Sequence, residues 1–218
     1  MKLSTETYRF KLTGENVEAH PAGCLFLLKE KILLLADLHL GKISHFRKYG
    51  SAITAEAAKS DYKKLTDIVT YYQPEKLLFL GDLFHSDYNS EFLLFKEWKE
   101  RYPELDVRLI LGNHDIIDTQ NFSDIGIKIQ DEYFMKNLFL THHPEDKEGY
   151  LNICGHIHPG FTLNGFGGQR TKLRCFYWKK NQLILPAFGN FTGKFLIKPQ
   201  KGETVLIMTD NAVFPLKS

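Results

Sequence analysis

Five short apolar runs, each ending in histidine, aspartate or asparagine, constrain this chain more than any other feature. The clearest run, LLFLGDLFHS at residues 77–86, carries Asp82 and His85 just past its apolar part. An apolar run of this length with no turn residue inside it predicts a strand buried on both faces of its sheet. Polar side chains at the end of such a strand lie where open α/β sheets bind their ligands. The run therefore predicts a ligand site at one edge of a sheet.

The other four runs have the same form. They are KILLLADLH with Asp37 and His39, VRLILGNHD with Asn113, His114 and Asp115, LFLTHH with His142 and His143, and LNICGHIH with His156 and His158. Seven of the nine histidines fall inside the five segments, a distribution not expected of scattered structural histidines. We therefore expect the five ends to meet at one two-metal site, with Asp82 between the ions.

The first half of the chain predicts a βαβ arrangement. Residues 1–22 are poorly patterned and either add an edge strand or wrap the surface, and residues 24–28 and 32–36 predict a hairpin. A helix is expected over about 51–72, ended by Pro74, and it leads into the strand before Asp82. A helix between two buried strands favours a parallel pair.

The second half has a different texture. A second helix is expected over about 90–102 and a strand over 107–111, while 118–126 is either loop or short helix. After Gly126 the apolar runs are short and closely spaced, which predicts strands. Together the two halves predict an α+β chain with two stacked sheets and helices outside. Because no linker or low-complexity tract interrupts it, we expect residues 1–218 to form a single domain.

The composition of the chain excludes few classes of protein. The net charge of +2 does not by itself indicate a nucleic-acid or membrane partner, although a local groove can still be basic. The three cysteines form no metal-type pair, so a disulfide framework is not expected. Neither a signal peptide nor a run of roughly 18 apolar residues is found, so we expect a cytoplasmic protein that does not enter a membrane.

The order of the polar segments carries a family resemblance. Asp37-x-His39, Gly81-Asp82-x-x-His85, Gly112-Asn113-His114-Asp115, His142 and Gly155-His156-x-His158 resemble the five motifs of the calcineurin-like metallophosphoesterases. The resemblance implies a four-layer α-β-β-α sandwich of two mixed sheets flanked by helices. It also implies that one ion is held by Asp37, His39 and His158 and the other by Asn113, His142 and His156, with Asp82 bridging. His142 is preferred to His143 because the family's ligand comes immediately after its strand.

The implied chemistry is hydrolysis of a phosphoester by in-line attack of a hydroxide that bridges two divalent ions. Mixed oxygen and nitrogen ligands favour Mn²⁺, with Fe or Zn²⁺ as alternatives. His114 is not assigned to an ion, so it is free to steady the developing charge and protonate the leaving oxygen. We expect His85 to orient His114, the alternative being an ordinary loop histidine.

Two longer stretches of sequence indicate which class of substrate to expect. LADLHLGKISHFRKYG at 35–50 and LPAFGNFTG at 185–193 resemble the bacterial ligase-associated metallophosphoesterases, described as DNA-damage-response endonucleases. His45 and Lys194 depart from the expected pattern, since small residues are expected at both positions. We expect Arg47, and with it Lys42, to approach substrate phosphate; the alternative is a solvated basic face.

Three functions follow as hypotheses. The first is a Mn-dependent phosphodiesterase or DNA nuclease in functional association with a DNA ligase and a helicase. The second is a phosphoesterase acting on a nucleotide or lipid-sugar phosphate. The third is a non-catalytic binding scaffold on the same fold, which is disfavoured because this chain retains every expected ligand. The sequence does not specify the oligomeric state.

Overall fold

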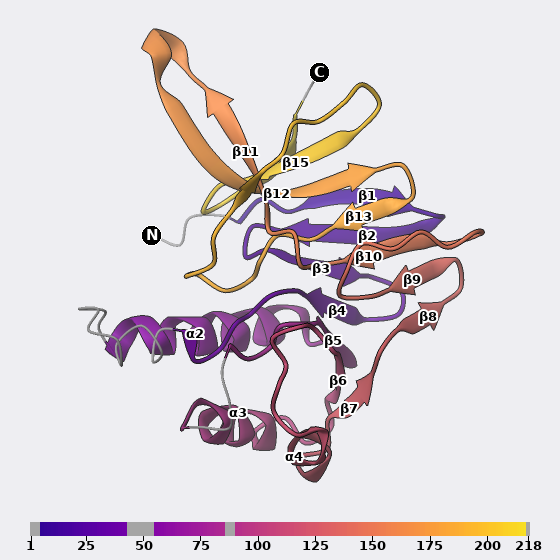
Figure 1. Ribbon diagram of the computed structural model, residues 1–218, viewed down its shortest axis with the longest axis vertical. Helices are drawn as coiled ribbons and strands as arrows, with labels where there is room; N and C mark the ends of the chain where they lie inside the picture. Colours follow the sequence, from indigo (N-terminus) through magenta and orange to yellow (C-terminus); the bar gives the residue numbers. More distant parts are fainter. Residues whose placement is uncertain (1–4, 43–54, 86–89, 217–218) are drawn as a thin grey trace.

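The computed structural model describes residues 5–42, 55–85 and 90–216. Two β-sheets stack face to face, and helices lie along the outer face of one of them (Figure 1). The β11–β12 hairpin extends away from this body. Among the described residues, no helix combines the length and apolar character needed to cross a membrane.

The first sheet has seven strands in the order of the chain. The first four pair antiparallel and the last four pair parallel, so the sheet is mixed. Its strands are β1 (Tyr8–Leu12), β2 (Glu15–His20), β3 (Cys24–Leu27), β4 (Ile32–Leu35), β5 (Lys76–Leu80), β6 (Asp106–Ile110) and β7 (Lys128–Gln130).

The second sheet has nine strands, and most of its pairs are antiparallel. The exceptions are β10, which pairs parallel with both β9 and β13, and β11, which pairs parallel with β14. The strands are β8 (Tyr133–Met135), β9 (Leu138–Leu140), β10 (Leu151–Cys154), β11 (Pro159–Asn164), β12 (Arg170–Lys179), β13 (Gln182–Ile184), β14 (Phe195–Leu196), β15 (Thr204–Met208) and β16 (Val213–Pro215). A short 3-10 helix, η1 (Phe166–Gly168), forms the tip between β11 and β12.

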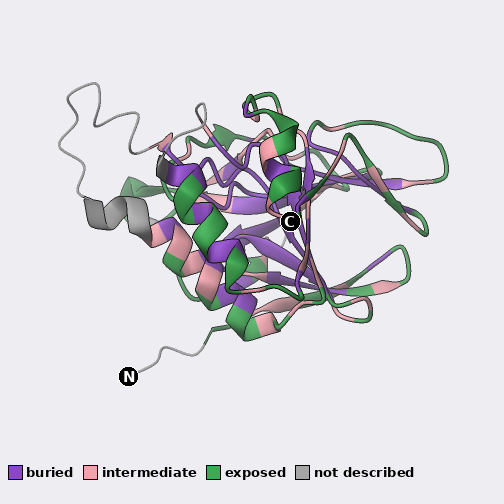
Figure 2. Ribbon diagram, turned by 90° about the horizontal axis from the view of Figure 1, so that it is seen from below, coloured by how far each residue is buried: buried purple, intermediate pink, exposed green. Residues whose placement is uncertain are grey.

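In the part of the chain that the structure describes, three α-helices cover the outer face of the first sheet: α2 (Ala55–Tyr72), α3 (Ser90–Glu100) and α4 (Thr119–Asp124). The apolar residues of α3, Phe92, Phe95 and Trp98, recur every third position and all point to the sheet. Each is at most 2% exposed, whereas the exposed residues of the helices lie on the side away from the sheet (Figure 2). Burial of these large side chains holds the helical layer in place, each contributing about 1.5–3 kcal/mol.

Three apolar clusters result among the described residues, and two of them contact the first sheet. One lies between the helices and the first sheet, and the other lies between the two sheets. In β5, Leu77 and Phe79 belong to the first core, while Leu78 and Leu80 belong to the second. Successive side chains of a strand point to opposite faces. The uninterrupted apolar run of β5 therefore follows from burial on both sides.

The expected first hairpin, the parallel pair β4–β5 and the series of short strands after Gly126 are confirmed. The helix expected over about 51–72 is present from Ala55 to Tyr72, and residues 51–54 lie outside the described residues. Residues 1–22 add two edge strands, β1 and β2, and residues 119–124 form a short helix. The sandwich of two mixed sheets is confirmed as well. One difference concerns the outer helical layers, because a four-layer sandwich would have helices outside both sheets. In the described ranges every α-helix packs on the first sheet, because the chain after Gly126 carries no helical period.

Candidate metal centre

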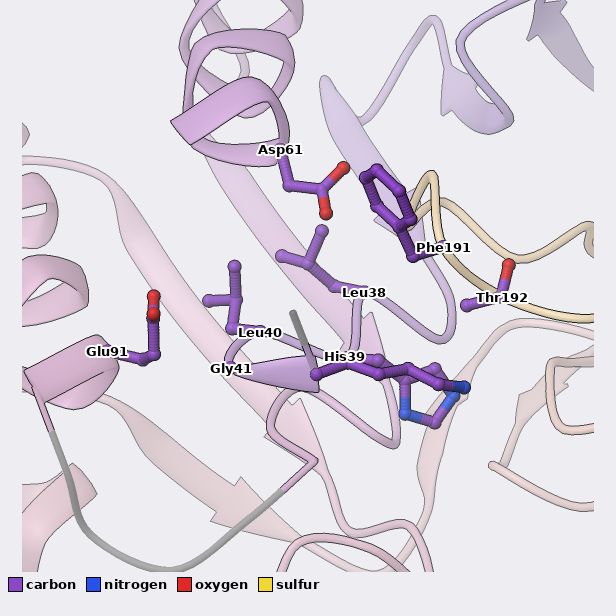
Figure 3. Close-up of a pocket in the computed structure, with 9 residues that line it drawn as sticks. Leu38, His39, Leu40, Gly41, Asp61, Glu91, Phe191 and Thr192 are labelled. Carbon is purple, nitrogen blue, oxygen red and sulfur yellow. The ribbon is translucent and has the colours of Figure 1, made fainter. Parts of the chain in front are cut away.

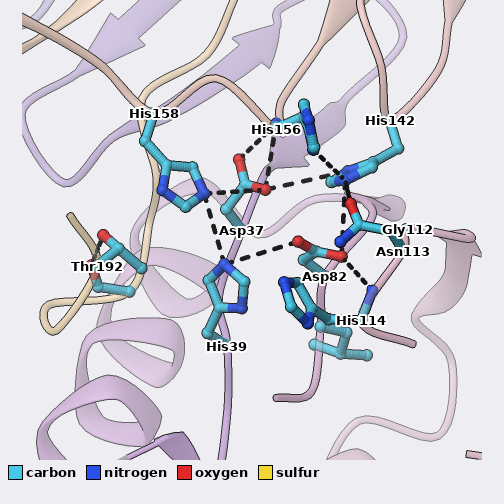
Figure 4. A network of polar contacts seen from close by, with 12 residues as sticks. Asp37, His39, Asp82, Gly112, Asn113, His114, His142, His156, His158 and Thr192 are labelled. Carbon is cyan, nitrogen blue, oxygen red and sulfur yellow. Dashed lines mark hydrogen bonds and ion pairs between the residues drawn. The ribbon is translucent and has the colours of Figure 1, made fainter. Parts of the chain in front are cut away.

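The predicted site residues lie at the carboxyl ends of five strands (Figure 4). Asp37, Asp82 and Asn113 follow β4, β5 and β6, which are neighbours and parallel, so their ends meet at one edge of the first sheet. His142 and His156 follow β9 and β10, a parallel pair in the second sheet. Because the sheets are stacked, the two sets of strand ends face each other across one site.

One group of side chains consists of Asp37, His39 and His158. Oδ1 of Asp37 lies 3.3 Å from Nε2 of His158, and Nε2 of His158 lies 3.4 Å from Nε2 of His39. Their ligand atoms all lie within 4.8 Å of one another, close enough to share one cation. The three residues are predicted to hold one ion, and the structure brings them together.

A second group surrounds His142. Its Nε2 lies 3.1 Å from Oδ1 of Asn113 and 3.1 Å from Nδ1 of His156. His142 is 2% exposed and points into the site. His143, the alternative ligand, is exposed, although its ring centroid lies 4.1 Å from that of His156. The His142, Asn113 and His156 set is therefore assembled as expected, with His143 at its outer side.

Asp82 lies between the two groups. Its Oδ2 is 3.7 Å from Nε2 of His39, and its Oδ1 is 3.5 Å from Nε2 of His142. Oδ1 also accepts a hydrogen bond from the backbone N–H of His114 at 2.9 Å. Each carboxylate oxygen thus faces a different group.

The backbone at the site is strained. Asp37, His39, Asp82, His156 and His158 all have positive φ angles, between 49° and 67°, and they are half of the ten non-glycine residues with this property in the described ranges. Such conformations cost roughly 1–3 kcal/mol each and persist where the surrounding structure enforces them. Gly112 is required for a related reason, because a Cβ there would collide with Oδ1 and the backbone nitrogen of Asp82.

The charge balance of the site fits cations. Asp37 and Asp82 are 0% and 2% exposed, and their ion-pair partners among the described residues are histidines alone. Burial lowers the pKa of His39 to about 2, with His158 as the next cause, and burial followed by His143 and His142 lowers the pKa of His156. These two imidazoles are neutral at pH 7 and do not balance the carboxylates. Buried carboxylates require a paired charge or a metal, so the donor set fits divalent ions.

A hydrogen bond to the backbone orients the imidazole of His142. Its Nδ1 lies 2.9 Å from the backbone oxygen of Leu80, so the N–H is placed on Nδ1 and the lone pair of Nε2 faces the site. This tautomer is assigned from the hydrogen-bond pattern. An imidazole held this way presents a fixed lone pair to a metal.

Asp115 ties two strand ends together, and the sequence assigned it no role. Its carboxylate accepts hydrogen bonds from the backbone N–H groups of Asp82, Leu83, Phe84 and Gly112 at 2.8, 2.8, 3.2 and 2.9 Å. Burial raises its pKa to about 6. This one side chain fixes the loops that carry Asp82 and Asn113.

The motif LPAFGNFTG forms a second support. The N–H groups of Phe188 and Gly189 donate to the backbone oxygens of Ala36 and Asp37 at 2.8 and 3.1 Å, so the segment runs beside the first ligand loop. Helix α2 holds the segment, because Nζ of Lys64 donates to Phe188 O at 2.5 Å and Asp61 accepts from the N–H of Asn190. The spacing of residues in the sequence did not predict these contacts of Lys64 and Asp61.

A small pocket adjoins the site (Figure 3). Asp61 and Glu91, which are 6% and 5% exposed, line it from the helices, and Phe191 and Thr192 line it from the LPAFGNFTG segment. His39 and Lys42 complete its lining on the side of the metal centre. Lys42 therefore lies at the rim of the pocket, and its contact with substrate stays a prediction. Arg47 falls outside the described residues.

His114 and His85 lie beside the metal centre. The ring centroid of His114 is 5.6 Å from that of His39 and 5.2 Å from that of His85. His114 is exposed, whereas His85 is partly buried behind it. His114 is therefore open to solvent beside the candidate metal centre, with the ring of His85 next to it; the roles expected of both residues stay predictions.

Fold and donor set define a metal-dependent hydrolase of phosphoester bonds. Residues 30–209 match the family model described as Calcineurin-like phosphoesterase, so the chain belongs to this family, as the motifs indicated. A solved structure titled "Crystal structure of Pseudomonas putida nuclease MPE" is 26% identical, with a TM-score of 0.82 over 97% of this chain and 100% of that chain. No curated protein matches the chain.

Proposed function

We propose that the chain is a two-metal phosphodiesterase that cleaves DNA. The position of Asp82 carries the proposal, because its two oxygens face His39 on one side and His142 on the other at 3.7 and 3.5 Å. A carboxylate placed in this way can serve two cations at once. The nuclease title of the Pseudomonas putida structure supports a phosphodiester as substrate, and DNA is our choice of polymer.

In this proposal Asp37, His39 and His158 would hold one ion, Asn113, His142 and His156 would hold the other, and Asp82 would serve both. Mn²⁺ is the preferred metal, with Fe or Zn²⁺ as alternatives, because the donors mix oxygen and nitrogen. When bound, two such ions polarise a phosphoryl oxygen and provide a nucleophile from water at neutral pH.

The protein's own groups complete the reaction. The backbone N–H of His114 donates a hydrogen bond to Asp82, which holds the residue next to the site. Because His114 is exposed, its imidazole lies on the solvent side. From there it stabilises charge on the phosphoryl group and gives a proton to the leaving oxygen. His85 positions this ring by packing against it. Lys42 and Arg47 bind substrate phosphate at the rim. Association with a DNA ligase and a helicase, and a cytoplasmic location, stay predictions.

The test compares two small substrates in the presence of Mn²⁺. Bis-p-nitrophenyl phosphate is a diester and p-nitrophenyl phosphate is the monoester, and the two share the same leaving group. The proposal predicts a higher kcat/KM for the diester, together with cleavage of single-stranded, nicked or duplex DNA. A strong preference for the monoester would instead favour a small-molecule phosphoesterase and refute the proposal.

A further inference from the structure

Acidic residues are absent from a long part of this chain. Residues 149–202 contain none of the 26 acidic residues but eight of the 28 lysines and arginines. The overall charge of +2 hides this asymmetry, because the acids are concentrated in the remainder of the sequence. The acid-free part begins just before His156 and His158, so it leads directly out of the metal centre.

The β11–β12 hairpin places three of these cations on one face. Arg170, Lys172 and Arg174 alternate along β12 and lie opposite Asn164, Thr162 and Gly160 of β11. Side chains two residues apart in a strand point the same way, about 6.7 Å apart. The opposite face carries Phe161, Leu163 and Leu173, which pack against an apolar cluster. The hairpin is therefore apolar toward the body of the protein and basic on its other face.

Lys194 joins the same face. A Cβ built on Gly160 would lie 2.9 Å from Cβ and 3.4 Å from Cδ of Lys194, so this lysine crosses the strand where Gly160 leaves room. Arg170, Lys172 and Lys194 are exposed, whereas Arg174 is partly buried and donates to the backbone oxygen of Ala187 at 3.1 Å. Three cations of the face are thus available to a ligand.

The basic face is continuous with the metal centre. A surface groove is lined by Lys172, Arg174, Lys194 and Thr192, with Asp210 as the one acidic residue in its lining. Thr192 also lines the pocket next to His39, and it lies beside His39 and His158 in Figure 4. A chain molecule bound at the metal centre can therefore continue past Thr192 onto the hairpin.

We propose that this face binds the sugar-phosphate backbone of the DNA strand next to the scissile phosphate, with Lys194, Lys172 and Arg170 each contacting a phosphate. Charge complementarity carries the inference, because each nucleotide of a DNA strand carries one negative charge, and the exposed cations of β12 recur along the strand about every 6.7 Å with no acidic residue between them. The inference rests on the proposed function and extends it by giving the path of the polymer outside the metal centre.

The test measures how DNA affinity depends on salt. Binding of a fluorescent 30-nucleotide single strand is followed by anisotropy between 50 and 200 mM KCl, in a His114→Ala background that slows cleavage and without added divalent metal. The triple variant Arg170→Gln, Lys172→Gln, Lys194→Gln should lower the slope of log K against log salt by about 2, since each phosphate contact to a single strand contributes about 0.7. Affinity at 50 mM KCl should fall tenfold or more.

Lys201→Gln is the matched control. Lys201 is exposed and belongs to the same acid-free part, but it lies in the turn before β15, next to the far end of β12. Its substitution should leave the slope unchanged. The single variant Lys172→Gln, which should lower the slope by about 0.7, serves if the triple variant is unstable.

The failures of the two proposals are distinguishable. If the triple variant and Lys172→Gln both keep the slope of Lys201→Gln, the basic face does not bind the DNA backbone and the inference is overturned, while cleavage of the diester by the unaltered chain still supports the proposed function. A preference of the unaltered chain for the monoester overturns the proposed function itself and the inference with it.

Discussion

Replacing Asp115 by asparagine tests how the ligand loops are held. One oxygen of Asp115 accepts from the N–H groups of Asp82 and Gly112, and the other accepts from those of Leu83 and Phe84. Asparagine keeps one oxygen and turns an NH₂ group toward two of the four donors. Each buried donor left unsatisfied costs about 1–3 kcal/mol. Asp115→Asn should therefore lower the free energy of unfolding by about 3 kcal/mol, and Tm by roughly 6–12 °C for a chain of this size.

Thermal unfolding in EDTA, followed by titration with Mn²⁺, measures both consequences. Groups that orient metal ligands typically affect metal affinity by about 10–100-fold, so the variant should bind Mn²⁺ more weakly by a factor in this range. The control is Asp118→Asn, which makes the same chemical change at an exposed helix N-cap, where the two residues are nearly equivalent. If Asp115→Asn matches this control in both Tm and Mn²⁺ affinity, Asp115 does not organise the site.

Two further substitutions test separate steps. His114→Ala should keep both metal ions, as counted by elemental analysis, but lower kcat on bis-p-nitrophenyl phosphate by about 10²–10⁴-fold, since it removes the proton donor; undiminished kcat would rule this role out. Burial lowers the pKa of Lys64 from its ordinary 10.5 to about 7, so between these values the unfolded chain binds more protons and stability rises with pH. In urea unfolding, Lys64→Met should reduce the rise in the free energy of unfolding between pH 7.5 and 9 by about 1 kcal/mol, allowing for partial exposure. The control Lys63→Met, at an exposed neighbouring position, should leave the rise unchanged. If both variants show the same dependence of stability on pH, the burial argument for Lys64 is wrong.

The sequence predicted that the candidate ligands converge, because they follow strands of a recognisable kind. Apolar runs indicate buried strands, and parallel neighbours bring their carboxyl ends to one edge, so Asp37, Asp82 and Asn113 converge without any knowledge of distances. His142 rather than His143 has the parity of Leu138 and Leu140, which face the core between the sheets, so strand alternation was a usable signal for it.

The supporting residues were not predictable in the same way. Asp115 accepts hydrogen bonds from backbone N–H groups of a loop 31 to 33 positions earlier, and Lys64 donates to a carbonyl 124 positions later. Such contacts impose no periodicity on the sequence and depend on how the loops pack. The basic face of the hairpin was missed for another reason, because a net charge of +2 averages over an acid-free part and an acidic remainder.

The central claim is that two ions share Asp82. A crystal grown with Mn²⁺ and measured at the manganese absorption edge tests it directly, because anomalous scattering locates each metal. We expect two peaks about 3.5–4 Å apart, one near His39 and His158 and one near His142 and Asn113, with Asp82 contacting both. A single peak, or two peaks that leave Asp82 without a metal contact, would contradict the account.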